Sequence, residues 1–138
     1  MERFYTGQEA EASKCFTMED VRQFAILSGD DNPLHVDGEY AENGRFGRCV
    51  VHGILVSGLI SRVLGTQLPG EGSIYLEQNL SFRKPVYVGD TVTARVRITE
   101  IRTEKNIIIL ETNVYDQEEN CVILGTAKIL YDRREVCF

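Results

Sequence analysis

The 138-residue sequence predicts an α+β fold, in which one antiparallel sheet wraps around a single long apolar helix. The first observation is the run from Ile54 to Leu64, which is the most apolar helix candidate in the chain. The second is a change of period after Ser73, where apolar and polar residues begin to alternate as they do in half-buried strands. Such a sheet has exposed edge strands, and pairing two edges would cover one of them, so we expect a homodimer.

The first forty residues carry signals for one strand and two short helical segments. We expect a strand over residues 11–16, followed by a helix that Thr17 caps through its hydroxyl group. The helix ends at Ser28 and Gly29. A polar, turn-rich loop over residues 30–38 follows, and then a helical turn over residues 39–43.

The long apolar helix carries a narrow stripe of small residues. Four of them recur at every fourth position: Gly53, Ser57, Ser61 and Gly65. A stripe of this kind lets another part of the molecule approach the helix closely. Two interpretations stay open, because either the sheet or a ligand channel could occupy that side.

From Ser73 onward the sequence predicts consecutive antiparallel strands. In the first, four apolar residues are expected to share one face: Ile74, Leu76, Leu80 and Phe82. Residues 91–99 alternate clearly and form a half-buried strand. Residues 107–115 and 121–131 form two more strands around a polar hairpin. These last two are apolar on both faces, which predicts a central position or one beneath the helix.

Composition and charge narrow the classes of function. The formal net charge is −6, and an acidic surface repels phosphate backbones, so we expect no nucleic-acid partner. No apolar run approaches the ~20 residues that cross a bilayer, and the N-terminus lacks the apolar stretch of a secretory signal, so we expect a cytoplasmic protein. Arg83 and Lys84 are candidates for offsetting the negative charge around a nucleotide-bearing ligand.

The four cysteines give no metal-binding pattern. Cys15, Cys49, Cys121 and Cys137 form no CxxC pair, and only two histidines could join them. We therefore expect no metal site, and we interpret the cysteines as reduced thiols that mostly serve packing.

The segment Ser28–Asp37 concentrates the residues that can do chemistry. It places Asp30 and His35 five residues apart around a turn that Pro33 stiffens. A carboxylate and an imidazole at this spacing can both aim at one point, where they can hold a water molecule and move its protons. Asn32 adds an amide that can fix a substrate group or orient the pair. The alternative is an ordinary structural turn, in which Asp and Asn are common.

A second feature lies at the start of the long helix. His52-Gly53 opens this helix, so the Gly53 N–H is one of the backbone donors that have no partner within the helix. The helix dipole favours negative charge at the same place. A thioester oxygen bound there would gain stabilisation as it becomes an enolate, as in an oxyanion hole.

Two blocks of sequence resemble a known family. SGDDNPLHVD followed by VVHGILVSGLISRVLG is similar to the signature of the MaoC-like (R)-specific enoyl-CoA hydratases, which have the hotdog fold. The stretches LPGEGSIYL and Phe82 to Asp90 also resemble these enzymes. The resemblance runs from about Thr17 to the C-terminus and implies a single MaoC-like hotdog domain over residues 1–138.

The resemblance also implies roles for individual residues. Asp30 and His35 match the catalytic pair, Asn32 matches the residue that supports them, and the Gly53 N–H matches the donor that polarises the thioester carbonyl. Ser61 matches a serine near the catalytic pair, and with Ser57 it is expected to line the substrate pocket. Three further residues are expected to be structural: Asp31 as a solvated loop carboxylate, Asp37 as a capping residue, and His52 as a scaffold residue before Gly53.

The implied activity is the reversible hydration of trans-2-enoyl-CoA to (R)-3-hydroxyacyl-CoA, with short to medium acyl chains and no cofactor. Asp30 is the favoured base. The product would serve fatty-acid metabolism or polyhydroxyalkanoate storage. The alternatives are a dehydratase of (R)-3-hydroxyacyl thioesters on acyl carrier protein, a hotdog thioesterase, and a non-catalytic module that binds acyl-CoA.

Overall fold

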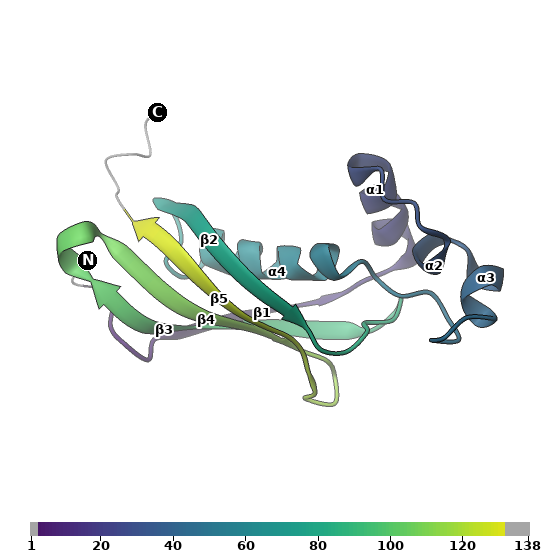
Figure 1. Ribbon diagram of the computed structural model, residues 1–138. Coiled ribbons are helices and arrows are strands. Elements are labelled where there is room, and N and C mark those ends of the chain that lie inside the picture. The colour runs from purple at the N-terminus through teal and green to yellow at the C-terminus, as the bar shows by residue number, and fades with distance from the viewer. Residues whose placement is uncertain (1–2, 132–138) are drawn as a thin grey trace.

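In the computed structural model, which describes residues 3–131, one curved antiparallel sheet wraps around a long helix (Figure 1). The helices are α1 (Met18–Ser28), α2 (Pro33–Val36), α3 (Gly38–Glu42) and α4 (Gly53–Thr66), with a 3-10 turn η1 (Thr103–Lys105). The strands are β1 (Glu9–Cys15), β2 (Ser73–Phe82), β3 (Thr91–Arg102), β4 (Ile107–Tyr115) and β5 (Cys121–Tyr131). Their order in the sheet is β1-β3-β4-β5-β2, with all neighbours antiparallel. The expected architecture is confirmed, including the inner position of β4 and β5.

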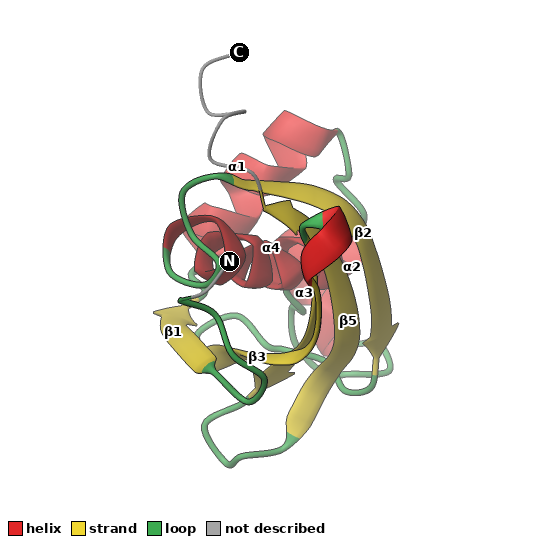
Figure 2. Cartoon of the chain, turned by 90° about the vertical axis from the view of Figure 1, so that its left-hand side faces the viewer, coloured by secondary structure: helices red, strands yellow, loops and turns green. Residues whose placement is uncertain are grey.

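The core lies between α4 and the concave face of the sheet (Figure 2). The buried side of α4 consists of Val56, Leu59, Ile60, Val63 and Leu64. Opposite them, β3 contributes four residues without solvent exposure: Val92, Ala94, Val96 and Ile98. The alternation predicted for residues 91–99 is therefore confirmed, and the burial of these side chains is the main apolar contribution that fixes α4 on the sheet.

Of the small residues of α4, only Gly53 lies against the sheet, where it meets the ring of Phe82 at the end of β2. Ser61 and Gly65 are exposed, and Gly53 and Ser57 are half-buried. A Cβ atom added at Gly65 would meet no other atom within 4 Å. The interpretation that this stripe lets the sheet approach therefore holds only at Gly53, because larger apolar residues on the other side of α4 supply the main contact with the sheet.

Helices α1, α2 and α3 extend beyond one end of the sheet (Figure 1). Helix α1 begins with a capping box, in which the Asp20 N–H donates to the Thr17 hydroxyl at 3.2 Å and the Thr17 N–H donates to the Asp20 carboxylate at 2.9 Å. It ends at Gly29, whose φ of 82° is left-handed. The loop expected over residues 30–38 is wrong in one respect, because it contains the one-turn helix α2.

Strand β2 departs from simple alternation. Its register against β5 shifts between Tyr75 and Glu77, so Leu76 lies in a bulge. Leu76 and Phe82 are both about half exposed, whereas Ile74 and Leu80 are partly buried. The prediction that these four residues share one face is therefore wrong, since the bulge breaks the period of two.

The cysteines of the described region differ in their surroundings. Cys49 is buried, and burial raises the pKa of its thiol. Cys121 is half-buried and Cys15 is exposed, so packing accounts for only part of this set. Cys137 lies outside the described residues. Among residues 3–131, no helix is long and apolar enough to cross a membrane.

Candidate active site

The loop after α1 positions the predicted catalytic pair through local hydrogen bonds. The Asp30 N–H donates to the Ser28 hydroxyl at 3.1 Å, and the Asn32 N–H donates to the Asp30 carboxylate at 3.4 Å. The Asn32 side-chain oxygen accepts from the Leu34 N–H at 3.0 Å and so caps α2. Asn32 therefore supports the site by starting the helix that carries His35.

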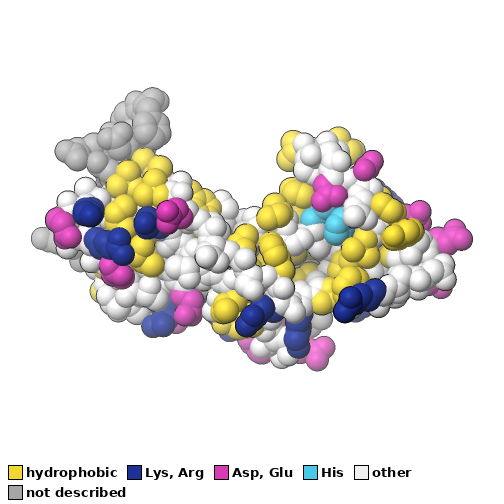
Figure 3. Space-filling view, in the orientation of Figure 1, with side chains coloured by type: hydrophobic (Ala, Val, Ile, Leu, Met, Phe, Trp, Pro, Cys, Tyr) yellow, Lys and Arg dark blue, Asp and Glu magenta, His cyan; other side chains and the backbone are white. Residues whose placement is uncertain are grey.

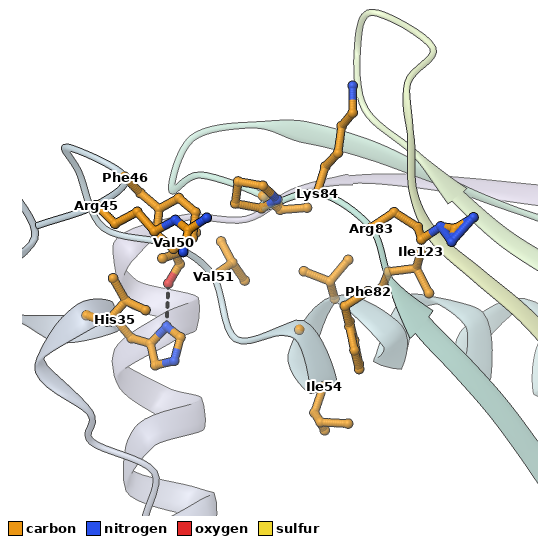
Figure 4. Close-up of a pocket in the computed structure, with 15 residues that line it drawn as sticks. His35, Arg45, Phe46, Val50, Val51, Ile54, Phe82, Arg83, Lys84 and Ile123 are labelled. Atoms are coloured by element: carbon orange, nitrogen blue, oxygen red, sulfur yellow. Dashed lines mark hydrogen bonds between the residues drawn. The ribbon is translucent and has the colours of Figure 1, made fainter.

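His35 is held in one orientation by the segment that precedes α4. Its Nδ1 atom lies 2.6 Å from the carbonyl oxygen of Val50 (Figure 4). A carbonyl oxygen can only accept, so Nδ1 carries the hydrogen. In the neutral ring, Nε2 is then left with a free lone pair. His35 thus offers an acceptor nitrogen for a water or a substrate group.

His52 lies directly beside the pair. It is only 2% exposed, and its Nε2 lies 2.9 Å from the backbone carbonyl oxygen of Asp30. Its ring stacks on that of His35, with centroids 3.9 Å apart and planes inclined by 26°. Phe24 of α1 also packs against the ring of His52, in an edge-on arrangement with a centroid distance of 4.8 Å. The sequence suggested a scaffold role for His52, but the stacking was not anticipated.

Ligand atoms of Asp30, His35 and His52 all lie within 4.8 Å of one another. Two features make this cluster a poor fit for a metal ion. The two rings are stacked in planes inclined by only 26°, and a nitrogen lone pair lies in the plane of its ring, so an atom in line with one lone pair lies out of the plane of the other ring. One nitrogen of each ring also faces a carbonyl oxygen. The separation does suit a single water molecule, which can bridge two polar atoms at about 2.8 Å from each.

A cavity of about 600 Å³ opens beside this cluster. It lies within the usual range for small-molecule sites. Figure 3 shows the hollow, with the histidine surface on one side and hydrophobic side chains around it. The lining residues are Leu34, His35, Arg45, Phe46, Val50, Val51, Gly53, Ile54, Val56, Phe82, Arg83, Lys84, Pro85, Val86 and Ile123.

Gly53 lies in the wall of the cavity at the first residue of α4, as the sequence predicted. Its N–H is among the first four of the helix, which have no partner within the helix. A Cβ atom at this position would lie 2.7 Å from two ring carbons of Phe82. Phe82 therefore packs against the bare Cα of Gly53, and both residues shape the same wall.

Three cationic side chains line the mouth of the cavity. They are Arg45, Arg83 and Lys84, of which the sequence suggested the last two. Within residues 3–131, none of the three forms an ion pair with a carboxylate. Figure 4 shows Arg83 and Lys84 with their head groups pointing away from His35. The cavity thus leads from an acid–base cluster to a positively charged rim.

The remaining predicted site residues fall into two groups. Ser57 and Ser61 do not line the cavity, and the Ser57 hydroxyl donates to the Ile54 carbonyl oxygen at 2.7 Å. Asp31 is exposed, as expected, and the Asp37 carboxylate accepts from the Tyr40 N–H at 3.1 Å and caps α3, as expected. Sequence reasoning missed Arg45 and Phe46, which no motif distinguishes from other loop residues.

Comparisons with known proteins agree with this arrangement. Residues 3–120 match the family model described as MaoC like domain. The chain is 48% identical over 123 residues to an (R)-specific enoyl-CoA hydratase from Aeromonas caviae, covering 89% of this chain and 92% of that protein. It is 46% identical over 123 residues to one from Rhodospirillum rubrum, covering 89% and 81% respectively.

The fold agrees as well. The solved structure of an (R)-hydratase from A. caviae involved in PHA biosynthesis superimposes with a TM-score of 0.93 at 45% identity, covering 96% of this chain and all of that one. The expectation of a hotdog fold is confirmed. The chain belongs to the MaoC-like family and has the hotdog fold of its (R)-hydratases.

Proposed function

We propose that this protein is an (R)-specific enoyl-CoA hydratase, which reversibly adds water to trans-2-enoyl-CoA. The observation that carries the proposal is that His35 and Gly53 line one cavity, while a carboxylate oxygen of Asp30 lies within 4.8 Å of a ring nitrogen of His35. The pair can hold and deprotonate water, and the N–H can polarise a carbonyl group. The 48% identity to a hydratase of this specificity supports the same reaction.

The chemistry follows from the positions of these groups. The thioester carbonyl accepts a hydrogen bond from the Gly53 N–H, which makes C3 of the enoyl group electrophilic. Asp30 takes one proton of the bound water while the bare Nε2 of His35 accepts a hydrogen bond from the other. The water oxygen bonds to C3, and the π electrons move onto the thioester as an enolate. The proton then returns to C2 on the same face, so the reaction requires no cofactor.

The charged mouth of the cavity favours a coenzyme A thioester. The phosphates of coenzyme A need local positive charge on a protein whose net charge is −6. Arg45, Arg83 and Lys84 supply it where the thioester would enter. We also propose that the protein acts in the cytoplasm and that its product enters polyester storage or fatty-acid metabolism, as the role of the (R)-hydratase from A. caviae in PHA biosynthesis suggests.

We also propose that two copies of the chain pair through β2. Strand β2 is hydrogen-bonded only to β5 within the described part of the chain. It exposes Tyr75, Leu76 and Phe82 but carries only one charged residue. The opposite edge, β1, carries three charged residues, a feature that discourages edge pairing. Light scattering should give twice the mass of the chain, and a monomer at micromolar concentration would contradict the dimer.

The direct test uses purified protein and crotonyl-CoA. Hydration removes the conjugated double bond, so the ultraviolet absorbance of the enoyl thioester should fall, and chiral analysis should give (R)-3-hydroxybutyryl-CoA. Release of free coenzyme A would instead indicate a thioesterase. Activity only on the acyl carrier protein thioester would indicate the dehydratase of lipid synthesis, and binding without turnover would indicate a non-catalytic module.

A further inference from the structure

The mechanism above assigns no task to His52, although it is the most buried ionisable side chain of the cluster. Three contacts surround it. Its Nε2 faces the Asp30 carbonyl oxygen, one face of its ring lies on the ring of His35, and the ring of Phe24 packs against it at an inclination of 64°. His52 therefore touches both members of the catalytic pair without lining the cavity.

These contacts indicate which ring nitrogen of His52 carries a hydrogen. The Asp30 carbonyl oxygen can only accept, so His52 carries its hydrogen on Nε2. Its Nδ1 is buried and has no hydrogen-bond partner among the described residues. A hydrogen on Nδ1 would thus be a buried donor without an acceptor, which is costly. The surroundings therefore favour a hydrogen on Nε2 of His52 over one on Nδ1.

We propose that His52 is a positioning residue. It holds Asp30 and His35 in the relative positions that they need to bind and activate one water molecule. Its Nε2–H fixes the Asp30 peptide, from which the carboxylate projects, and its ring provides the flat surface on which His35 lies. His52 does not touch the substrate. This inference rests on the proposed hydratase function, because it assigns His52 an effect on that reaction.

The two contacts can be separated by substitution. His52→Gln keeps an N–H donor for the Asp30 carbonyl oxygen but removes the ring. His52→Phe keeps a ring against His35 but removes the donor, and His52→Leu removes both. A matched control is Asn113→Leu, which removes a buried side-chain hydrogen bond to the Gly125 N–H in the sheet, away from the cavity.

We expect kcat to fall on the order of 10²-fold for His52→Leu, since misplacement of reacting groups by about 1 Å has that effect. The Gln and Phe variants should each retain part of the lost activity. KM for crotonyl-CoA should change little, because His52 does not line the cavity. Asn113→Leu should lower the melting temperature and leave kcat as it is.

A spectroscopic measurement tests the unmodified protein. Nitrogen-15 NMR of the imidazoles should show hydrogen on Nε2 of His52 and on Nδ1 of His35. A His52 with hydrogen on Nδ1 would overturn the proposal even if every variant failed to fold. Folded His52 variants with unchanged kcat, or with a change only in KM, would also overturn it. If the unmodified protein hydrates crotonyl-CoA, these outcomes count against His52 alone, and if it does not, the proposed function fails.

Discussion

The two ends of α4 carry similar small residues in different surroundings. At its start, Gly53 lies against the ring of Phe82 in the cavity wall, where even one added carbon would be too close. Near its other end, Gly65 belongs to the same stripe but has no neighbour within reach of an added Cβ. The spacing of small residues therefore marks a face of the helix, whereas only the contact made by each one determines its function.

The largest effect is expected at Asp30, which lies next to His52 at the start of α4. Replacing Asp30 with Asn removes the proposed base while preserving the side-chain shape. Turnover of crotonyl-CoA should fall by about 10²- to 10⁴-fold, the range for loss of a general base. Asp31→Asn is the matched control, because this exposed neighbour should leave turnover unchanged. Equal activity in both variants would remove Asp30 from the mechanism.

Gly53→Ala tests the close contact in the cavity wall. The added Cβ would displace the ring of Phe82, which is 51% exposed and can swing outward without unfolding the protein. We expect kcat to fall by roughly 10²-fold through misplacement of the thioester. Adding Phe82→Leu to Gly53→Ala should restore part of the activity. Full activity in the single variant would show that the contact does not shape the site.

The cationic rim should affect binding more than chemistry. Arg83→Ala should raise KM for crotonyl-CoA about tenfold, equivalent to roughly 1.4 kcal/mol, and leave kcat nearly constant. The same variant should not change KM for a crotonyl thioester that lacks the nucleotide. Lys105→Ala removes a positive charge at η1, outside the cavity lining, and serves as the control. A rise in KM for both thioesters would contradict a phosphate-binding role.

Near the C-terminal end of α4, a substitution is expected to stabilise the protein and to leave its activity unchanged. Gly65→Ala meets no atom and should stabilise the helix by about 1 kcal/mol, measured by denaturant unfolding, with activity unchanged. If this variant instead dissociates a dimer, the stripe packs against the second copy and the proposed β2 pairing would need revision.

The smallest effect concerns α1, which carries Phe24 against His52. Backbone hydrogen bonding from Thr17 is the main cause that holds the pKa of Asp20 below its usual value of 3.8. Because the folded-state pKa is lowered, this stabilisation is present above the unfolded pKa and is lost as pH falls through the folded value. Asp20→Asn should cost about 1 kcal/mol at neutral pH. The difference from the parent should vanish well below pH 3.8.

The sequence predicted those features of the fold that depend on a local pattern of residues. The alternation of Val92 to Ile98 required a half-buried strand, and Thr17 indicated the start of α1. The motif resemblance points to Asp30, His35 and Gly53 without regard to how close they lie in space. The stacking of His35 on His52 and the contact of Phe82 with Gly53 were not predictable, because they join segments whose approach depends on the whole packed fold.

The central claim is that Asp30, His35 and the Gly53 N–H add water across an enoyl thioester from one face. Hydration of crotonyl-CoA in deuterated water tests it most directly, because the product records both new bonds. The account predicts the (R) configuration at C3 and a single deuterium at C2 on the face that received the oxygen. An (S) product, or deuterium on the opposite face, would contradict the proposed arrangement of the site.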